Sequence, residues 1–369
     1  MTVTEGISYQ KYGLKEVINA SGKMTILGVS KVSDNVLAAQ QFGGQHFFEM
    51  SDLVIQTGRH IAQLLEVEDA IVVSSASAGI AQSVAGIIGQ GDLFHAYHPY
   101  TKKVSRREII VPKGHNVDYG TPVEVMVGLG GGKIVEAGYA NMCHAEHIEM
   151  MVTPETAAIL YIKSHHTVQK SMLSVAEAAA IAKKYQLPLI VDAAAEEDLE
   201  KYTAEGANLV IYSGGKAIEG PTSGLVIGDA TLIEWVRLQT KGIGRAMKVG
   251  KENILGFTTA IEDYIQNDSE SGHAMKARLQ PFLADLNTIA GIEATEEQDG
   301  AGRDIYRAKV AVNGPVTALE VVKQLKEGQL AIYTREYRAN NGVIEFDIRA
   351  VNQYEMTQIV ERLRSILNN

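Results

Sequence analysis

Short apolar runs separated by helical stretches fill the middle of the chain. The runs at 70–73, 109–111, 157–162, 188–192, 207–211 and 225–228 are rich in Ala, Val, Ile and Leu. Strands that are apolar along their whole length are buried on both faces, as in parallel sheets covered by helices. The pattern therefore predicts an α/β protein with a large, mostly parallel sheet.

Helix signals lie between these strands. Residues 80–88 form an apolar helical stretch directly after the first run. Ser174 and Glu177 are spaced as a capping box, which predicts the start of an alanine-rich helix that ends near Tyr185.

The pattern changes near Gly272. Residues 304–312, 329–334 and 343–349 resemble strands, with helices expected at 316–326 and 353–367. We therefore expect three parts: an N-terminal segment over 1–50, a large domain over 51–271 and a smaller α/β C-terminal domain over 272–369. The first segment lacks strong periodicity, and we expect it to join the small domain or to wrap a partner subunit.

Composition and charge narrow the class of protein. The chain has 369 residues, of which 46% are hydrophobic and 21% charged, as in globular enzymes with large cores. It has no run of 18 apolar residues and no signal-peptide pattern, so we expect neither membrane insertion nor export. Cys143, the one cysteine, excludes an internal disulfide and fits a cytoplasmic location.

The sequence disfavours a nucleic-acid partner and a metal site. Lys plus Arg number 34 against 44 Asp plus Glu, and the net charge of −10 argues against a nucleic-acid partner. Cys143, His144 and His147 lie close in sequence, but no second cluster supplies the remaining ligands of a closed metal site. We therefore expect no metal.

The run from Tyr212 to Lys216 (YSGGK) follows one apolar strand, and Asp192 closes the strand before it. This pairing is typical of pyridoxal phosphate enzymes, in which a lysine holds the cofactor aldehyde as a Schiff base and an aspartate keeps the pyridine nitrogen protonated. Ser213 and the glycines would let backbone and cofactor approach closely. The alternative is a surface lysine in a glycine turn.

Ser75, Ala76 and Ser77 lie between the strand at 70–73 and the helix that follows. Free N–H groups at a helix N-terminus suit a phosphate, although a serine N-cap alone would also explain the sequence. A phosphate loop, an aspartate and a lysine in this order together favour a pyridoxal phosphate site.

Four further segments complete the pattern: 17–22 (VINASG), 213–221 (SGGKAIEGP), 244–252 (GRAMKVGKE) and 333–340 (YTREYRAN). With them the chain resembles fold-type I pyridoxal phosphate-dependent enzymes, and within these the selenocysteine-synthase-like branch that contains the D-glucosaminate-6-phosphate ammonia lyases. The resemblance covers most of the chain and implies the fold-type I transferase fold.

The resemblance also implies a function. We expect an ammonia lyase that removes water and ammonia from a phosphorylated 2-amino-sugar acid, D-glucosaminate 6-phosphate, giving 2-keto-3-deoxy-6-phosphogluconate. Another reaction on the same scaffold, such as selenium transfer, β-elimination or aldol cleavage, is the alternative. The resemblance further implies a homodimer or larger homo-oligomer.

Histidines beside these strands are candidates for proton transfer. His115 follows the strand at 109–111, where enzymes of this resemblance place the group that stacks on the cofactor; the alternative is a turn histidine bound to backbone. Ser164, His165 and His166 follow the strand at 157–162, at the edge where open α/β sheets bind ligands. We expect Ser164 to contact the cofactor, and His165 and Gln169 to contact the substrate.

Cationic residues suit an anionic substrate. Arg245, Lys248 and Lys251 are spaced by three, which predicts one face of a helix and a phosphate site; a solvated basic face is the alternative. Arg335, Arg338 and Arg349 are candidates for the substrate carboxylate, because guanidinium binds carboxylate through two hydrogen bonds.

Overall fold

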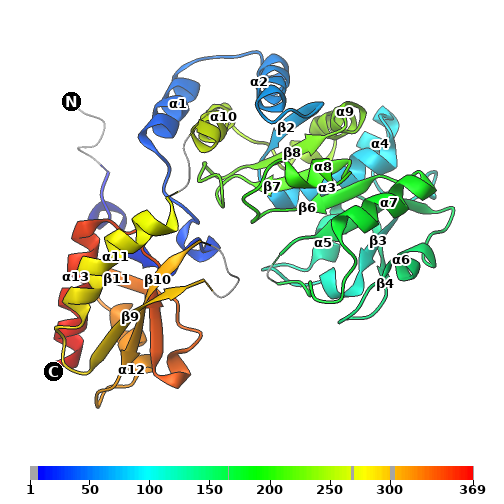
Figure 1. Ribbon diagram of the computed structural model, residues 1–369. Coiled ribbons are helices and arrows are strands. Elements are labelled where there is room, and N and C mark those ends of the chain that lie inside the picture. The colour runs from blue at the N-terminus through cyan, green and yellow to red at the C-terminus, as the bar shows by residue number, and fades with distance from the viewer. Residues whose placement is uncertain (1–6, 165, 267–269, 300–303, 369) are drawn as a thin grey trace. The chain divides into compact units, whose positions relative to one another are not determined.

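A computed structural model describes residues 7–164, 166–266, 270–299 and 304–368. Contacts divide the chain into two compact units, Met1–Lys31 with Asn267–Asn369, and Val32–Gln266 (Figure 1). The first 31 residues thus belong to the same unit as the C-terminal part. The domain boundaries expected at 50 and 271 stay predictions.

The larger unit contains a seven-stranded sheet. Strand β8 runs antiparallel to its neighbours β2 and β7, and the remaining neighbours pair in parallel. The prediction of an α/β protein with a mostly parallel sheet is therefore confirmed. In spatial order the strands are β2 (Asp69–Val73), β8 (Gly224–Gly228), β7 (Leu209–Ser213), β6 (Leu189–Asp192), β5 (Thr156–Ile162), β3 (Glu108–Pro112) and β4 (Lys133–Ala137).

Helices cover both faces of this sheet because successive side chains of each buried strand point to opposite sides. On β6, for example, Ile190 packs into one apolar cluster and Val191 into the other. One cluster includes residues of α2 (Met50–Leu64), α6 (Ala145–Glu149), α7 (Val175–Tyr185), α8 (Lys201–Ala204) and α10 (Lys251–Gln266). The other includes residues of α3 (Ala76–Gly89), α5 (Val123–Leu129) and α9 (Ala230–Leu238).

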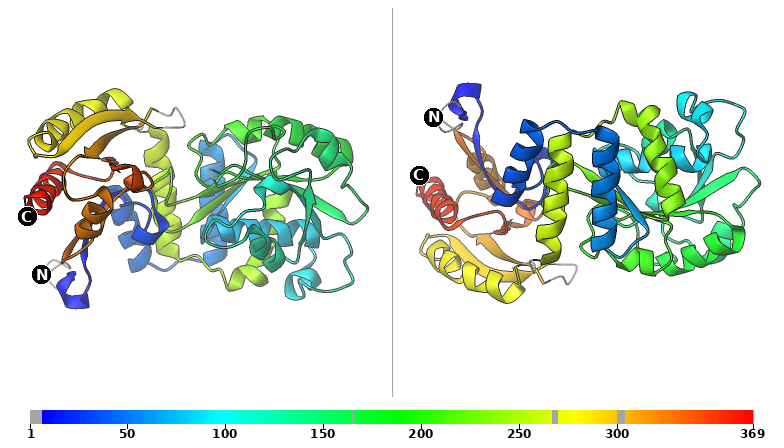
Figure 2. Two further views of the ribbon diagram at one scale, coloured as in Figure 1. Left: turned by 90° about the horizontal axis from the view of Figure 1, so that it is seen from below. Right: turned by 90° about the horizontal axis from the view of Figure 1, so that it is seen from above.

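The remaining elements of this unit are shorter or peripheral. Helix α1 (Asp34–Gln45) lies beside α10 (Figure 2), and α4 (Leu93–Tyr97) follows α3. The 3-10 helices are η3 (Lys113–His115), η4 (Gln239–Lys241) and η5 (Ile243–Arg245). No helix among the described residues is both long and apolar enough to cross a membrane.

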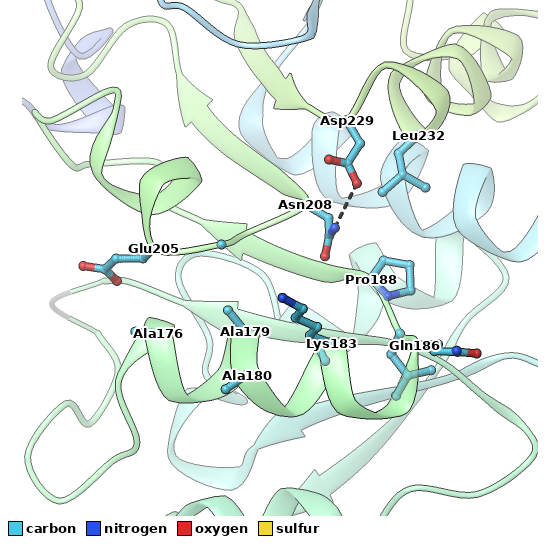
Figure 3. Close-up of a pocket in the computed structure, with 13 residues that line it drawn as sticks. Ala176, Ala179, Ala180, Lys183, Gln186, Pro188, Glu205, Asn208, Asp229 and Leu232 are labelled. Atoms are coloured by element: carbon cyan, nitrogen blue, oxygen red, sulfur yellow. Dashed lines mark hydrogen bonds between the residues drawn. The ribbon is translucent and has the colours of Figure 1, made fainter.

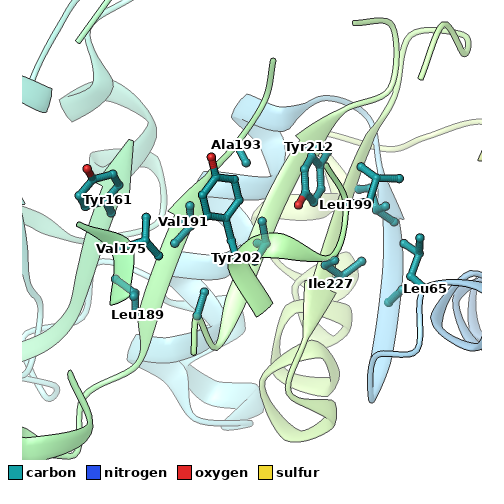
Figure 4. Packing of buried hydrophobic residues seen from close by; sticks show 14 of the residues in the cluster. Leu65, Tyr161, Val175, Leu189, Val191, Ala193, Leu199, Tyr202, Tyr212 and Ile227 are labelled. Carbon is teal, nitrogen blue, oxygen red and sulfur yellow. The ribbon is translucent and has the colours of Figure 1, made fainter. Parts of the chain in front are cut away.

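Tyrosines occupy the core beside β6 and β7 (Figure 4). The hydroxyl of Tyr202 donates to Glu196 at 2.6 Å, and that of Tyr212 donates to the carbonyl of Asp198 at 3.0 Å. Buried hydroxyls of this kind are retained because each finds a partner. Both bonds tie the loop after Asp192 to the core.

Local sequence signals explain several element boundaries. The capping box of α7 is confirmed, since Ser174 Oγ accepts from Glu177 N and the Glu177 side chain accepts from Ser174 N. Helix α3 begins at Ala76, earlier than the stretch from residue 80, because Ser75 caps it. Strand β7 extends to Ser213, beyond the expected end at 211, through its pairing with β8.

The smaller unit has two sheets and three α-helices in the described residues. Strand β1 (Glu16–Ala20) pairs in parallel with β11 (Leu330–Thr334), and β12 (Val343–Phe346), β10 (Tyr306–Val312) and β9 (Ile292–Gln298) form an antiparallel sheet. The helices are α11 (Gly272–Leu286), α12 (Ala318–Leu325) and α13 (Gln353–Leu367), with the short η1 (Gln10–Tyr12), η2 (Thr25–Leu27) and η6 (Ala339–Asn341). Strand β9 was not predicted, because its sequence is mostly polar.

Candidate active site

Three loops meet at the carboxyl edge of the large sheet. In the strand register, Gly224 of β8 pairs with Val73 of β2 on one side and with Ser213 of β7 on the other. Neighbouring strands lie about 4.8 Å apart, so β2 and β7 are separated by about 10 Å. The loop that precedes α3 and the loop that carries Lys216 therefore leave the sheet beside each other.

The first loop presents free N–H groups. Ser75 caps α3, its Oγ accepting from Ala78 N at 3.0 Å and its carbonyl from Gly79 N at 2.9 Å. The N–H groups of Ala76 and Ser77, the first two helical positions, have no acceptor within the helix. These donors and the positive end of the helix dipole suit a phosphate.

Gly224 brings this loop close to β8. A Cβ atom on Gly224 would lie 2.4 Å from the carbonyl carbon of Ser75 and 2.7 Å from the nitrogen of Ala76. Any larger residue would displace the loop, so the cradle depends on this glycine.

Asp192 provides a buried acid at the end of β6. Burial raises the pKa of this carboxyl to about 6, while the N–H of Ala194, at 3.1 Å, and the charge of Lys216 act in the opposite direction. A buried carboxylate with few donors is stabilised by a nearby cation. A protonated pyridine nitrogen meets this requirement.

Lys216 lies on a tightly packed turn. Gly220 N donates to Gly214 O at 2.8 Å, and a Cβ on Gly214 would lie only 2.0 Å from Ser223 Oγ. The lysine is half-buried and acts electrostatically on Asp192. A phosphate cradle, a buried acid and a neighbouring amine together fit pyridoxal phosphate.

His115 is enclosed by backbone. Its Nδ1 lies 3.3 Å from Ile162 N, which donates to it, and its Nε2 lies 3.1 Å from the carbonyl of Val168. The ring is fully buried, and burial lowers its pKa to about 4. This geometry is that of a neutral histidine bonded to backbone, and the expected stacking and proton-transfer roles stay predictions.

Gln169 and its neighbours form a hydrogen-bonded cluster after β5. The Gln169 amide donates to Ile162 O at 3.1 Å and to Thr167 Oγ1 at 2.5 Å, while its oxygen accepts from Lys163 Nζ at 3.0 Å. Ser164 Oγ accepts from the backbone N of His166, whose side chain is exposed. His165 lies outside the described residues.

Lys163 is a charged group at this edge that the sequence analysis missed. Its backbone N donates to Asp192 O at 2.8 Å, and its charge contributes to lowering the pKa of His115. Its position directly after the strand at 157–162 could have indicated that Lys163 lies at the ligand-binding edge.

Tyr119 was also missed by the sequence analysis. Its hydroxyl lies 3.1 Å from Ser77 Oγ, and nothing in the sequence of its own loop indicates this contact.

The prediction that Arg245, Lys248 and Lys251 share one helical face is wrong. Arg245 ends η5, Lys248 lies outside any helix and Lys251 begins α10. Gly250 lies in the non-helical stretch just before α10, where glycine disfavours a continuous helix, and a Cβ on Gly244 would lie 2.7 Å from the carbonyl oxygen of Gln239, which leaves no room for a side chain there.

Lys251 is engaged elsewhere, because its Nζ donates to three carbonyls at the end of α1, those of Gly43, Gly44 and His46, at 2.6, 3.0 and 2.5 Å. Cations stabilise helix C-termini in this way. Arg245 and Lys248 are exposed and line a cavity of about 960 Å³. Their phosphate-binding role stays a prediction.

A second cavity, of about 580 Å³, lies at the opposite edge of the sheet (Figure 3). Pro188 and Asn208, which precede β6 and β7, line it, and Asn208 donates to Asp229 at 2.8 Å. Because Asp192 and Ser213 stand at the other ends of these strands, this cavity is separate from the candidate site.

The three arginines lie in the smaller unit, each beside a carboxylate. Arg335 donates to Glu345 at 3.3 Å, and Arg338 contacts both Glu297 and Glu345. Arg349 binds both oxygens of Asp347, at 2.9 and 2.8 Å.

Asp347 joins two arginines. Its Oδ2 also accepts from the buried Arg307 at 3.0 Å. Burial alone would raise the pKa of Asp347, but Arg349 and Arg307 lower it to about 2.

No group of three His, Cys, Asp or Glu residues in the described ranges is arranged to hold a metal ion. His144 and His147 instead cap α6, since the N of His144 donates to His147 Nδ1 at 2.9 Å. The expectation of no metal stays a prediction.

Comparison with known proteins identifies the family. The family model "SelA: L-seryl-tRNA selenium transferase" matches residues 100–281. D-Glucosaminate-6-phosphate ammonia lyase of Salmonella typhimurium is 45% identical, over 97% of both chains. The chain belongs to the family of this enzyme. A 5'-C-glycyluridine monooxygenase-decarboxylase of a Streptomyces species is 34% identical over 99% of this chain and 93% of its own.

Comparison with solved structures supports the same family and identifies the fold. A structure of D-glucosaminate-6-phosphate ammonia-lyase superimposes with a TM-score of 0.93 at 44% identity, covering 100% of this chain and 99% of its own. Serine palmitoyltransferase of Sphingomonas wittichii, 15% identical, covers 94% and 86% with a TM-score of 0.53 and so shares the fold. The expected fold-type I transferase fold is confirmed.

The histidine geometry predicts how stability depends on pH. His115 has a pKa of about 4 when folded, against 6.5 for an ordinary histidine. The unfolded chain therefore takes up a proton first as the pH falls, and the free energy of unfolding decreases by about 3 kcal/mol between pH 6.5 and 4. His115→Phe should show a correspondingly flatter pH dependence in chemical denaturation. Parallel curves for the two proteins would contradict the burial of a neutral His115.

Proposed function

We propose that the chain is a pyridoxal phosphate-dependent ammonia lyase acting on D-glucosaminate 6-phosphate. The observation that carries this proposal is the meeting of the α3 N-terminus, Asp192 and Lys216 at one sheet edge, in a chain that is 45% identical to the Salmonella typhimurium enzyme over nearly its full length. The products would be 2-keto-3-deoxy-6-phosphogluconate and ammonia, because the water lost in elimination returns when the imine product is hydrolysed.

When bound, pyridoxal phosphate supplies an electron-accepting ring next to the substrate nitrogen. The N–H groups of Ala76 and Ser77 would hold its phosphate, with Ser75 fixing their orientation. Asp192 would keep a proton on the ring nitrogen, and its burial strengthens that interaction. Ser213 and Ser164, at the ends of β7 and β5, would line the same site.

Lys216 would hold the aldehyde before substrate arrives and then remove the proton from the substrate Cα. Two observations support this proposal: the packed glycine turn fixes the backbone, and the Lys216 side chain is half-buried. The leaving hydroxide needs a proton donor. We assign this role to His166, whose exposed imidazole follows β5, since both ring nitrogens of His115 face backbone groups.

The substrate has anionic groups at both ends. We propose Arg349 for the carboxylate, because buried Asp347 fixes the plane of its guanidinium. Arg335 and Arg338, which both pair with Glu345, are the alternatives for this role. Arg245 and Lys248 are the proposed contacts of the sugar phosphate, with Gln169 and His165 as further substrate contacts.

The deciding experiment is an assay for ammonia and 2-oxo acid with D-glucosaminate 6-phosphate, D-glucosaminate and serine as substrates. We expect turnover of the phosphorylated sugar acid and little of the other two. Lys216→Ala should abolish turnover and also the attachment of cofactor to protein after borohydride reduction, measured by mass spectrometry. Lys201→Ala, at an exposed lysine of α8, should change neither.

The same assay separates the alternatives. No ammonia from any sugar acid, with cofactor still attached to Lys216, would favour another reaction of the scaffold and overturn the lyase. His166→Asn should lower turnover with little change in KM, whereas Arg349→Lys should mainly raise KM, since lysine lacks the two-point geometry.

The role of Asp192 has its own test. Asp192→Asn should retain cofactor but lower turnover by roughly 100-fold or more, because an amide carries no charge to hold a proton on the ring nitrogen. Asp229→Asn, at the far edge of the sheet, is the matched control and should behave as wild type. Turnover of Asp192→Asn within twofold of wild type would rule out this partner.

We also propose that the chain works as a homodimer or larger assembly. Four large apolar side chains on α1, on the loop after it and at the start of α2 are exposed: Leu37 51%, Phe42 51%, Phe47 100% and Met50 41%. Exposed apolar groups in this number mark an association surface, and symmetric self-association is the commonest kind. Sedimentation velocity should show at least a dimer, and Phe47→Ser should weaken it; a fully active wild-type monomer would contradict the proposal.

A further inference from the structure

Tyr119 lies on a closed loop that the proposed mechanism does not use. The loop leaves η3 and enters α5, and its base is joined by the bond from Val123 N to Val117 O, at 3.1 Å, and by a bridge between Asp118 and Pro122. Gly120 N also donates to Asp118 Oδ1 at 2.7 Å. These bonds hold Tyr119 at the tip of an ordered loop.

The Tyr119 side chain reaches the phosphate cradle. Its half-buried ring packs against the apolar cluster between the sheet and α3, and its hydroxyl lies 3.1 Å from Ser77 Oγ. Ser77 is the second residue of α3, so this hydroxyl lies beside the unpaired N–H groups of the helix.

The same hydroxyl lies within the field of the buried acid. Burial raises the pKa of Tyr119, the bond to Ser77 lowers it, and the charge of Asp192 raises it again. The phenol therefore stays protonated at neutral pH and can donate a hydrogen bond. The Tyr119 hydroxyl is thus bonded to Ser77 at the start of α3 and is influenced by the charge of Asp192.

We propose that Tyr119 is a cofactor-binding residue whose hydroxyl, together with that of Ser77, donates to the phosphate of pyridoxal phosphate. Two hydroxyls bonded to each other use only one of their two protons, whereas a phosphate offers enough acceptor oxygens for both. This inference rests on the proposed cofactor and extends the phosphate site beyond the helix N-terminus.

The test compares Tyr119→Phe with wild type by equilibrium dialysis of the cofactor-free chain against pyridoxal phosphate and, separately, pyridoxal. Loss of a hydrogen bond to a charged group should raise the Kd for pyridoxal phosphate roughly 10-fold or more. The Kd for pyridoxal, which lacks the phosphate, should stay unchanged. Tyr139→Phe, at an exposed tyrosine, is the matched control and should bind both as wild type does.

The outcomes are distinguishable. Unchanged pyridoxal phosphate binding by Tyr119→Phe would overturn the inference and leave the proposed function intact. Equal weakening of both ligands would also overturn it, because the hydroxyl would then support the loop and not the phosphate. Failure of wild type itself to bind pyridoxal phosphate would overturn the proposed function and this inference with it.

Discussion

Asp192 is buried at the end of a central strand, where water cannot solvate its carboxylate. Its pKa of about 6, against an ordinary 3.8, means that ionisation at pH 7 costs the folded chain about 3 kcal/mol. Because the carboxyl pKa is raised, the free energy of unfolding decreases as the pH rises from about 4 to about 6, where only the unfolded chain loses this proton readily. A cation beside Asp192 offsets this cost. The burial of Asp192 therefore contributes to the affinity of the folded chain for a protonated cofactor.

The loops around Asp192 pack closely against the sheet because glycines at the contact points have no side chain. Gly224 lets the Ser75 loop pass against β8, and Gly214 lets the lysine turn pack on Ser223. Gly79 in α3 has a similar role, because a Cβ there would lie 2.9 Å from Ile211 Cγ2. Since the protein interior is close-packed, each of these positions sets how near the donors, the acid and the amine lie to one another.

Membership of the family does not by itself fix the reaction. A relative 34% identical over almost the whole chain carries the name of a monooxygenase-decarboxylase, and an L-seryl-tRNA(Sec) selenium transferase of Alkaliphilus metalliredigens is 24% identical over 97% of this chain. The scaffold thus supports different chemistries, and the difference must come from side chains around the shared acid and lysine. The residues after β5 and the arginines of the smaller unit are where we place that difference.

Much of the fold follows from local sequence. Buried strands show as short apolar runs, and caps such as Ser174 with Glu177 fix helix ends, because these signals depend on neighbours along the chain. The order of Ser75, Asp192 and Lys216 was also sufficient to suggest the cofactor, since strand ends of a parallel sheet meet at one edge.

Tertiary structure decided the rest, because these contacts join residues far apart in sequence. His115 has a lowered pKa because the fold buries its ring, and its Nδ1 accepts from Ile162 N, 47 residues further along the chain. The position of Lys251 depends on carbonyls at the end of α1. The spacing of Arg245, Lys248 and Lys251 predicts one basic helix, yet η5 ends at Arg245 and α10 begins only at Lys251. Tyr119 meets Ser77 only because a loop folds over the start of α3, and no local pattern encodes such a meeting.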